Sequence, residues 1–297
     1  MWLIFALIAP LFFGIVHVMD SYCVEDIFER PWLGMVTSAF TSLVVYLALP
    51  FFLPLVTWYM PPWQIIAMAL AAGALIQFSQ FLYFQSLSYS EAGIIAAYWN
   101  MIPAILIVLS FVLFGHVLTP TQYFGIAILV AASTYMILLD HNFEYRLLSF
   151  FLMLIASIMQ ACAYLLLDAT YEVIPYLQAF YIMITGLILT GFAPLLFAQA
   201  QKTFQRELPK LLPLVRFFLW IEVANLLALA SAQKALSLGD PSIVASVETT
   251  IPAFTFMISL GLLYTAAHTY GDQQSRIRLP WKLCAVGMMC LGVWMVS

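Results

Sequence analysis

Residues 93–114 read GIIAAYWNMIPAILIVLSFVLF, and this stretch decides the class of fold. None of its 22 residues is charged. A helix that crosses a bilayer needs roughly 20 apolar residues, so the stretch predicts a membrane-spanning helix. The whole chain has the same character, because 65% of its 297 residues are hydrophobic and only 8% are charged. A soluble domain carries about 25% charged residues, so this composition excludes a soluble fold.

Nine further apolar segments accompany a predicted span at residues 92–114. They lie at about 1–19, 32–58, 64–87, 122–139, 147–167, 176–199, 212–236, 242–264 and 280–296. Every backbone polar group in lipid needs an internal partner, so long apolar runs of this kind must be helices. The sequence therefore predicts an all-α polytopic membrane protein with ten transmembrane helices.

The sequence repeats weakly when it is shifted by 149 residues. The tripeptide Ile-Pro-Ala at 102–104 then meets the same tripeptide at 251–253. We therefore predict two five-helix repeats, at residues 1–146 and 147–297. An odd number of spans places the second repeat upside down relative to the first. Inverted repeats are typical of transporters whose binding site lies between the two halves.

The stretch from Ser86 to Leu138 carries a more specific resemblance. It reads SLSYSEAGIIAAYWNMIPAILIVLSFVLFGHVLTPTQYFGIAILVAASTYMIL, and residues 235–296 repeat it more loosely. With two five-helix units in about 300 residues, the chain resembles the drug/metabolite transporter superfamily, in its ten-helix EamA-like branch. The resemblance covers essentially the whole chain and implies a transporter. The family often has a glutamate just after the fourth and ninth spans, where this sequence has His116 and Thr265.

Positive charge predicts the orientation. The loops after spans 1, 5, 7 and 9 lie on one side and hold nine of the ten basic residues: Arg30, Arg146, Lys202, Arg206, Lys210, Arg216, Arg276, Arg278 and Lys282. The other side holds only Lys234. Basic loops stay in the cytoplasm, so both termini are predicted outside it, in the plasma (inner) membrane. Members of the resembled family usually have cytoplasmic termini, and we give the charge count more weight.

Two glutamates, Glu222 and Glu248, lie inside predicted spans. Ionisable groups within a bilayer cost several kcal/mol and usually face a cavity or a partner. Glu222 lies about ten residues from the basic end of its span, and hence near the midplane. The functional interpretation is a carboxylate that binds substrate or a coupling proton. The structural alternative is a neutral carboxyl, or one that is paired with a neighbouring helix.

Each half also has a proline inside a predicted span, Pro103 and Pro252. A mid-helix proline removes the hydrogen bond to the carbonyl four residues earlier, here that of Trp99 and that of Glu248. These two residues are equivalent under the repeat shift. Broken backbone at membrane depth is tolerated where it lines a cavity, so we predict Trp99 and Glu248 as opposite walls of one site. The alternative is that both prolines only bend helices for packing.

The remaining candidates share a polar side chain within a predicted span. They are His17, Gln77, Gln80, Tyr98, Asn100 and Asn225. Polar groups in lipid are expected to face protein or water, so these residues are predicted to line the cavity. A lone histidine on an apolar helix is more often a hydrogen-bonded packing residue, and this alternative stands for His17.

Small residues recur seven apart in the last span of each half, at Gly125 and Ala132 and at Ala285 and Gly292. Such residues favour close helix packing, so these two spans are predicted to be scaffold. The four cysteines show no metal-ligand spacing, and no phosphate loop or hydrolase motif is present. We therefore expect no metal, no cofactor, no enzymatic activity and no nucleic-acid partner.

The first functional hypothesis is a secondary transporter with a central cavity and alternating access. Two acidic groups with almost no basic partner favour an organic cation, an amino-acid-like zwitterion or coupling protons. Tryptophan and tyrosine beside a carboxylate also suit ammonium recognition. The alternative is a lipid-carrier translocator or a structural membrane subunit without an aqueous substrate. The sequence leaves the substrate, the direction of transport and a homodimeric state open.

Overall fold

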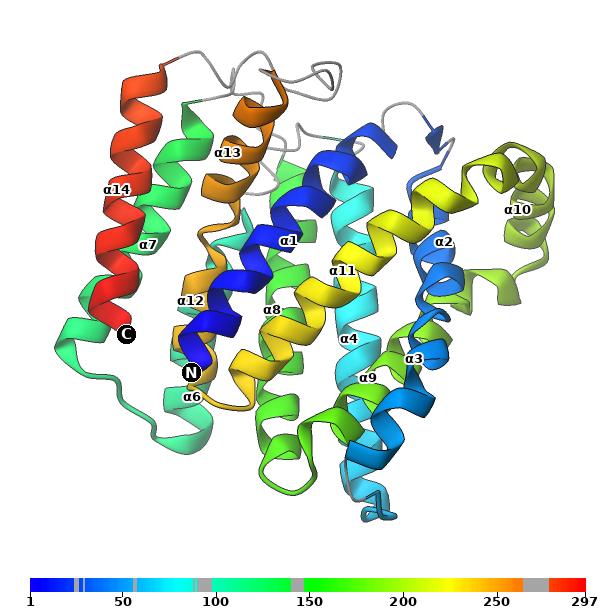
Figure 1. Ribbon diagram of the computed structural model, residues 1–297, viewed down its shortest axis with the longest axis horizontal. Coiled ribbons are helices and arrows are strands. Elements are labelled where there is room, and N and C mark those ends of the chain that lie inside the picture. The colour runs from blue at the N-terminus through cyan, green and yellow to red at the C-terminus, as the bar shows by residue number, and fades with distance from the viewer. Residues whose placement is uncertain are drawn as a thin grey trace.

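The fold is taken from a computed structural model of the chain (Figure 1). The structure describes residues 1–23, 27–28, 30–55, 58–87, 89, 98–139, 147–263 and 278–297. All regular elements in these ranges are helices. The predicted all-α class is confirmed for this part of the chain.

The helices of the first half begin with α1. They are α1 (Trp2–Tyr22), α2 (Trp32–Ser42), α3 (Val45–Phe52), α4 (Trp63–Leu87), α6 (Met101–Phe114) and α7 (Pro120–Leu138). Those of the second half are α8 (Leu147–Tyr171), α9 (Tyr176–Gly191), α10 (Ala198–Leu211), α11 (Val215–Leu236), α12 (Pro241–Glu248), α13 (Ile251–Leu263) and α14 (Leu279–Val296). Short 3₁₀ turns at Leu53–Leu55, Ala193–Leu196 and Leu212–Leu214 join some of them.

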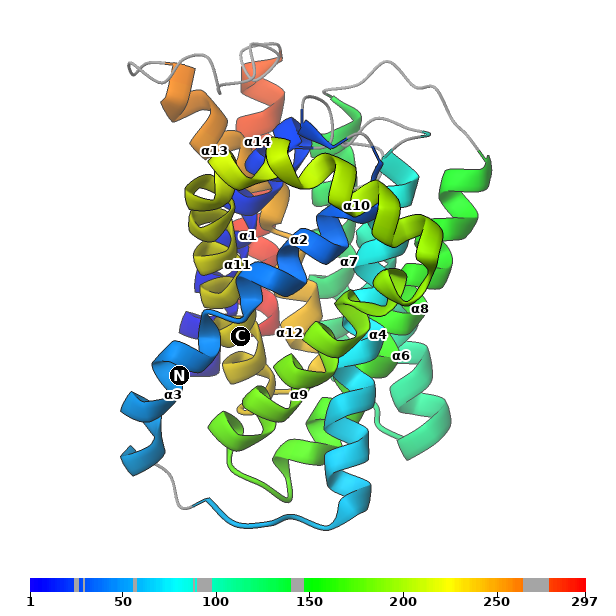
Figure 2. The same cartoon turned by 90° about the vertical axis from the view of Figure 1, so that its right-hand side faces the viewer.

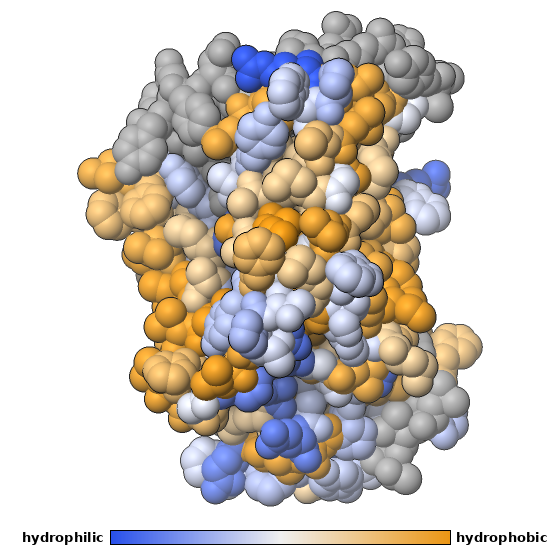
Figure 3. Space-filling view, turned by 90° about the vertical axis from the view of Figure 1, so that its left-hand side faces the viewer, coloured by the Kyte–Doolittle hydropathy of each residue, from blue (hydrophilic) through white to orange (hydrophobic). Residues whose placement is uncertain are grey.

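Eight stretches of helix in the described residues are long and apolar enough to cross a membrane. Two apolar helices, α6 and α9, are shorter. Figure 3 shows hydrophobic side chains over much of the face on the α14 side, where Trp294 is 74% exposed. An exposed apolar surface of this kind suits contact with lipid. The helices are consistent with a polytopic membrane protein, and the count of ten spans stays a prediction.

Local sequence explains where several helices begin and end. Thr119 caps α7 in a capping box with Gln122, and Pro120 takes the first helical position. Gly115 ends α6 in the left-handed conformation, with φ of 66°. Asp240 caps α12 by accepting hydrogen bonds from two backbone N–H groups.

The connection after α9 differs from the sequence prediction. Residues 200–211 were expected in a basic loop, but the structure places them in α10, a helix with charged and apolar residues (Figure 2). Its Glu207 carboxylate is buried and paired with the side chains of Arg206, 3.1 Å away, and Lys210, 2.8 Å away. Phe204 stacks on Phe40 of α2 and anchors the helix to the bundle. A short polar helix gives no long apolar run, which is why the hydrophobicity pattern missed it.

Lys282 also departs from its expected place in a basic loop. It lies in the first turns of α14, is fully buried, and has its ammonium 5.5 Å from the centre of the Phe256 ring. Long lysine stems can be buried along apolar surface, so the charge alone did not mark a loop. Two further members of the basic set, Arg146 and Arg276, lie outside the described residues.

The two halves of the chain interleave. The most extensive contacts join α4 to α8 and α9, α1 to α11, and α7 to α14 (Figures 1 and 2). Each of these pairs takes one helix from residues 1–139 and one from residues 147–297. The predicted division into repeats at residues 1–146 and 147–297 thus does not correspond to two separate packing units, and its origin by duplication stays a prediction.

Glycines bring α4 and α9 into backbone contact. A Cβ atom added at Gly73 would lie 1.9 Å from the carbonyl oxygen of Met183, and one added at Gly186 would lie 2.2 Å from that of Leu70. Only glycine fits at such distances. Gly73 therefore packs against α9 and does not face the cavity, although it shares a helix with Gln77 and Gln80.

The predicted small-residue contact of the last spans is confirmed. A Cβ at Gly125 of α7 would lie 3.1 Å from the carbonyl oxygen of Gly292 in α14, and the reverse distance is also 3.1 Å. Ala132 and Ala285 are fully buried in the same cluster. This pair of helices lines neither of the two cavities described below.

We predict that Gly73→Ala destabilises the protein by about 1–3 kcal/mol, because the new methyl group must separate α4 from α9. Gly261→Ala in α13 is the matched control, since nothing lies within 4 Å of a Cβ added there. Its effect should be near zero or stabilising. Melting temperatures of the purified variants measure the difference, and equal values for the two variants would contradict the backbone contact.

Candidate functional site

Two adjoining cavities lie in the middle of the bundle, between α1, α4, α8, α11 and α12. They contain about 1040 Å³ and 700 Å³ of empty space, openings included. Six residues line both: Phe13, His17, Gln80, Trp99, Gln160 and Tyr164. The first cavity also holds Glu222, and the second also holds Glu248. The two predicted carboxylates therefore belong to neighbouring parts of one central space.

Glu222 in α11 is only 3% exposed and is surrounded by hydrogen-bond donors. Ser38 and Thr41 donate to Oε2, at 2.9 Å and 3.4 Å. Ser42 donates to Oε1 at 2.6 Å, and the amide of Asn225 donates to the same oxygen at 3.3 Å. Three of these four donors come from α2, so the carboxylate also ties the two helices together.

The hydroxyl-bearing face of α2 was missed by the sequence analysis. Its residues 37–42 read TSAFTS, which places Thr37, Ser38 and Thr41 on the cavity wall. Hydroxyls spaced four residues apart lie on one face of a helix. Serine and threonine are common in membrane helices as packing residues, so the pattern alone gave no reason to connect them with Glu222.

Glu248 at the end of α12 has a different environment. The Tyr164 hydroxyl donates to its Oε2 at 2.5 Å. Its other oxygen, Oε1, is buried and has no hydrogen-bond partner among the described residues. Trp99 lines the same cavity and packs beside Tyr83, with ring centres 6.0 Å apart. The structure thus brings Trp99 and Glu248 to one cavity, while their role in binding stays a prediction.

The two prolines mark helix starts and not mid-helix kinks. Pro252 is the second residue of α13, and a two-residue turn at Thr249 and Thr250 separates that helix from α12 (Figure 1). Pro103 is the third residue of α6. The helix is interrupted directly after Glu248, and both prolines lie in the first turn of the helix that follows and not in mid-helix. Proline is tolerated in the first turn of a helix, where its missing N–H has no intrahelical acceptor.

The other predicted polar residues differ in where they point. Gln77 lines the first cavity and donates to the Met35 carbonyl at 3.2 Å, and Gln80 lines both cavities. His17 also lines both and packs edge to face with Tyr83, at 5.8 Å between ring centres.

Two residues beside Trp99 fit the prediction less well. Asn100 lines the second cavity, but its amide is tied to α7 through Ser133 at 3.0 Å. Tyr98 lines neither cavity, and its ring packs edge to face against Phe150 of α8. Neighbouring residues at a helix start point in different directions, so proximity to Trp99 in sequence did not place Tyr98 in the cavity.

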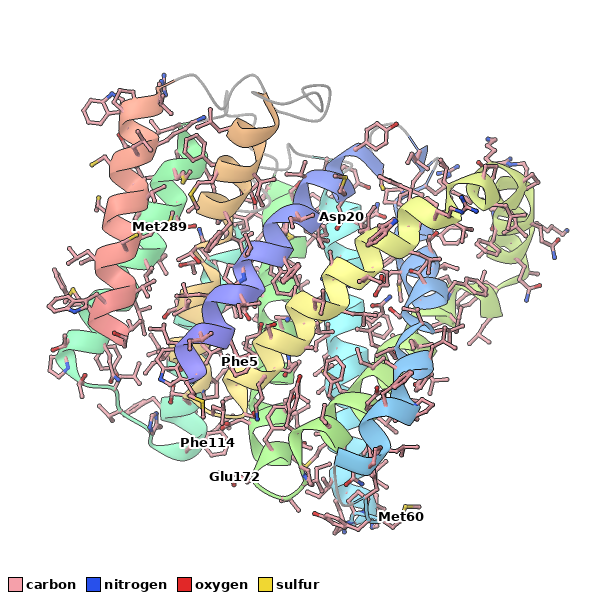
Figure 4. All side chains as sticks on the ribbon, in the orientation of Figure 1. Phe5, Asp20, Met60, Phe114, Glu172 and Met289 are labelled. Atoms are coloured by element: carbon pink, nitrogen blue, oxygen red, sulfur yellow. The ribbon has the colours of Figure 1, made fainter. Side chains whose placement is uncertain are left out.

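A third carboxylate, Asp20, was not among the predicted site residues. It lines the first cavity near the end of α1, in the upper half of Figure 4. Phe114 and Glu172 lie in the lower half of the same view. Asp20 lies at the end of the first predicted span, and the sequence analysis gave it no role in the site.

Comparison with known proteins gives one match to a family. The sequence model of the EamA-like transporter family matches residues 1–139, just under half of the chain. This family is part of the drug/metabolite transporter superfamily, so the predicted resemblance is confirmed. Proteins of that family are membrane transporters, which fits the apolar helices of a multi-pass membrane protein and the expectation that the chain is not an enzyme.

The fold of the chain is similar to that of a solved structure. A protein described only as "Crystal structure of protein" superimposes with a TM-score of 0.68 at 12% sequence identity. The match covers 99% of this chain and 96% of the other. At this identity the likeness concerns the fold alone. No curated protein matches the sequence.

We predict that Tyr164→Phe costs about 1–3 kcal/mol, because it leaves both oxygens of Glu248 without a donor among the described residues. In a Glu248→Gln background the same change should cost less, since a neutral amide needs the donor less. Tyr171→Phe is the control, because the Tyr171 hydroxyl donates to Gln233 at 2.9 Å and not to Glu248. Unfolding free energies of the single and double variants measure the coupling. An equal cost of Tyr164→Phe in both backgrounds would argue against the bond.

Proposed function

We propose that this protein is a secondary transporter that binds a small organic cation, or an amino-acid-like zwitterion with an accessible ammonium group. The site is the second cavity, with Glu248 as the anionic wall and Trp99 as the aromatic wall. The scaffold is a bundle of ten spans in two inverted repeats. Transport proceeds by alternating access, as the two halves rock about the central site.

The free oxygen of Glu248 carries this proposal. Oε1 is buried and accepts no hydrogen bond from the described residues, and Glu248 lies on the cavity wall. A buried carboxylate oxygen without a donor is costly unless a ligand satisfies it. The described residues that line the two cavities include no lysine or arginine. A ligand that brings its own positive N–H group would satisfy both needs.

Trp99 gives the second part of the recognition. An ammonium group over the face of a tryptophan is attracted by the ring quadrupole, most strongly where water is excluded. Trp99 lines both cavities, and so does Tyr164, whose hydroxyl donates to Glu248. A ligand held between them would be in contact with a carboxylate on one side and an aromatic ring on the other.

The pattern of helix contacts supports the inverted repeat. The 149-residue shift exchanges α1 with α8 and α4 with α11. Under this exchange the pair α1–α11 becomes the pair α8–α4, and both pairs are among the most extensive contacts. A pseudo-twofold axis that relates the halves would produce this symmetry, and it would also set Trp99 opposite Glu248.

The shape of the cavity supports alternating access. The first cavity continues toward one end of the bundle, where Asp20, Cys23 and Phe28 line it. At the other end, the turn before α12 is closed over α1, because a Cβ at Gly239 would lie 3.2 Å from the Trp2 ring. His116 bridges to Asp240 there, at 3.1 Å. Opening that end would require these contacts to separate.

The orientation follows from the same two ends. Both termini lie in the lower half of Figures 1 and 2, whereas α10 and the start of α14 lie above them. The basic residues of α10 and Arg278 at the start of α14 thus share one end. Basic segments favour the cytoplasm, so we place this end there and both termini outside, in the plasma membrane.

The test begins with melting temperatures of the purified protein in the presence of amines, amino acids and nucleosides, because a bound ligand stabilises the folded state. For a cationic ligand found in this way, Trp99→Ala should weaken binding by roughly thirtyfold, which corresponds to the loss of a desolvated cation–π contact of about 2 kcal/mol. Trp99→Phe should weaken it less.

Glu248→Gln provides the charge control and should weaken cationic ligands much more than neutral ones. Binding of cations that is unaffected by both Trp99→Ala and Glu248→Gln would refute the assigned site. A protein that is stabilised by no aqueous compound but by specific lipids would support a lipid-carrier translocator.

A further inference from the structure

The hydrogen bonds at Glu222 match an ionised carboxylate. An ionised carboxylate only accepts, and its two oxygens offer about four lone-pair sites. Two donors approach each oxygen here: Ser38 and Thr41 at Oε2, and Ser42 and Asn225 at Oε1. An ionised carboxylate can accept from Ser38, Ser42 and Asn225 at the same time, because each of these groups has a hydrogen to donate.

Among the described residues that line its cavity, none supplies a fixed positive charge to balance this carboxylate. Glu222 is 3% exposed, and the described residues that line its cavity include no lysine or arginine. Asp20 lines the same cavity and adds a second acidic group. His17 contributes the only imidazole in that lining, and it packs against Tyr83. An ionised carboxylate inside a membrane is usually paired, so the site calls for a positive charge that comes from outside the chain.

Further hydroxyl oxygens lie on the wall of the same cavity. The Thr37 hydroxyl oxygen is buried, has no hydrogen-bond partner among the described residues, and belongs to a residue on the same cavity wall. Thr41 has two other acceptors for its hydroxyl hydrogen, the carbonyls of Thr37 at 3.0 Å and Ser38 at 3.1 Å. It can therefore release Glu222 Oε2 and turn its own lone pairs toward a ligand.

We propose that Glu222, Thr37 and Thr41 form a binding site for a sodium ion. Carboxylate and hydroxyl oxygens are ligands for hard cations. One carboxylate in direct contact with the ion balances a single positive charge, as on Na⁺. A Ca²⁺ ion takes six to eight oxygen ligands and usually several carboxylates. This site is separate from the organic-cation site at Glu248, and it supplies the coupling ion for the transporter proposed above, on which that part of the inference rests.

The two sites are adjacent but have distinct walls. Trp99 and Tyr164 line both cavities, whereas Thr37 and Thr41 line only the first and Glu248 only the second. A sodium ion at Glu222 would thus sit on the α2 side of the shared wall. This separation allows each site to be disabled without touching the other.

The experiment measures melting temperatures of the purified protein at constant ionic strength in NaCl, KCl or N-methylglucamine chloride, with no organic ligand. We expect a saturable rise with Na⁺ that K⁺ and N-methylglucamine do not produce. Glu222→Gln should abolish the rise, and Glu248→Gln should leave it unchanged. An equal response to Na⁺ and K⁺, or a full Na⁺ response in Glu222→Gln, would overturn the proposal.

Thr37→Val keeps the test decisive if Glu222→Gln does not fold. Because the Thr37 hydroxyl has no partner in the described structure, its replacement by a methyl group should cost no stability in sodium-free buffer. The sodium concentration at half-maximal response should rise roughly tenfold, as one ion–oxygen contact is lost. Thr37→Ser should restore the response. An unchanged sodium response in Thr37→Val would also overturn the site.

Failure of this site and failure of the proposed function give different results. If Na⁺ has no effect but a cationic ligand still stabilises the protein through Trp99 and Glu248, the sodium site is wrong and the transporter proposal stands. If Na⁺ stabilises the protein through Glu222 and no organic compound binds, the sodium site stands without the organic-cation site.

Discussion

A carboxylate inside a membrane needs hydrogen-bond donors or a positive charge, and the rest of this structure depends on how two glutamates meet that need. Glu222 receives four donors, three of them from α2. Glu248 receives one, from Tyr164, and keeps one oxygen free. The first arrangement suits an ionised side chain. The second leaves Oε1 of Glu248 without a partner among the described residues, and we propose that a ligand fills this place.

The scaffold holds these two carboxylates near each other by interleaving the halves. Glycines at the α4–α9 contact and at the α7–α14 contact allow close backbone approach between the two halves. The central space remains between α1, α4, α8 and α11, where long polar and aromatic side chains meet.

The apolar segments and the two glutamates within them could be predicted from sequence, because each leaves a strong signal, whereas the repeat shift leaves a weak one and stays a prediction. Glu222 and Glu248 stand out against apolar neighbours, and the repeat pairs Trp99 with Glu248. The side to which a residue points could not be predicted in the same way. Tyr98 turns toward Phe150, and Gly73 faces α9, because helix rotation is set by packing partners far away in sequence.

Other features were hidden by their ordinary composition. The role of the α2 hydroxyls is visible only in the structure, where the Ser42 hydroxyl donates to Glu222 Oε1 at 2.6 Å although the two residues are 180 positions apart in sequence. The helix α10 lacks an apolar run, and Lys282 carries a charge into the protein interior. Contacts between residues far apart in sequence determine the roles of the α2 hydroxyls, α10 and Lys282, and the local sequence around each of them does not show these contacts. Pro103 and Pro252 were predicted in mid-helix, but both lie in the first turn of a helix.

The central claim is that water reaches one space between the halves, and cysteine labelling tests it most directly. In a background without Cys23, Cys162, Cys284 and Cys290, a cysteine is placed at Gln80, which lines both cavities. Leu291 on the exposed face of α14 and the buried Ala132 are the controls. The account predicts that a charged, water-soluble thiol reagent labels position 80 and neither control. Position 80 labelling no faster than Leu291 and Ala132 would contradict it.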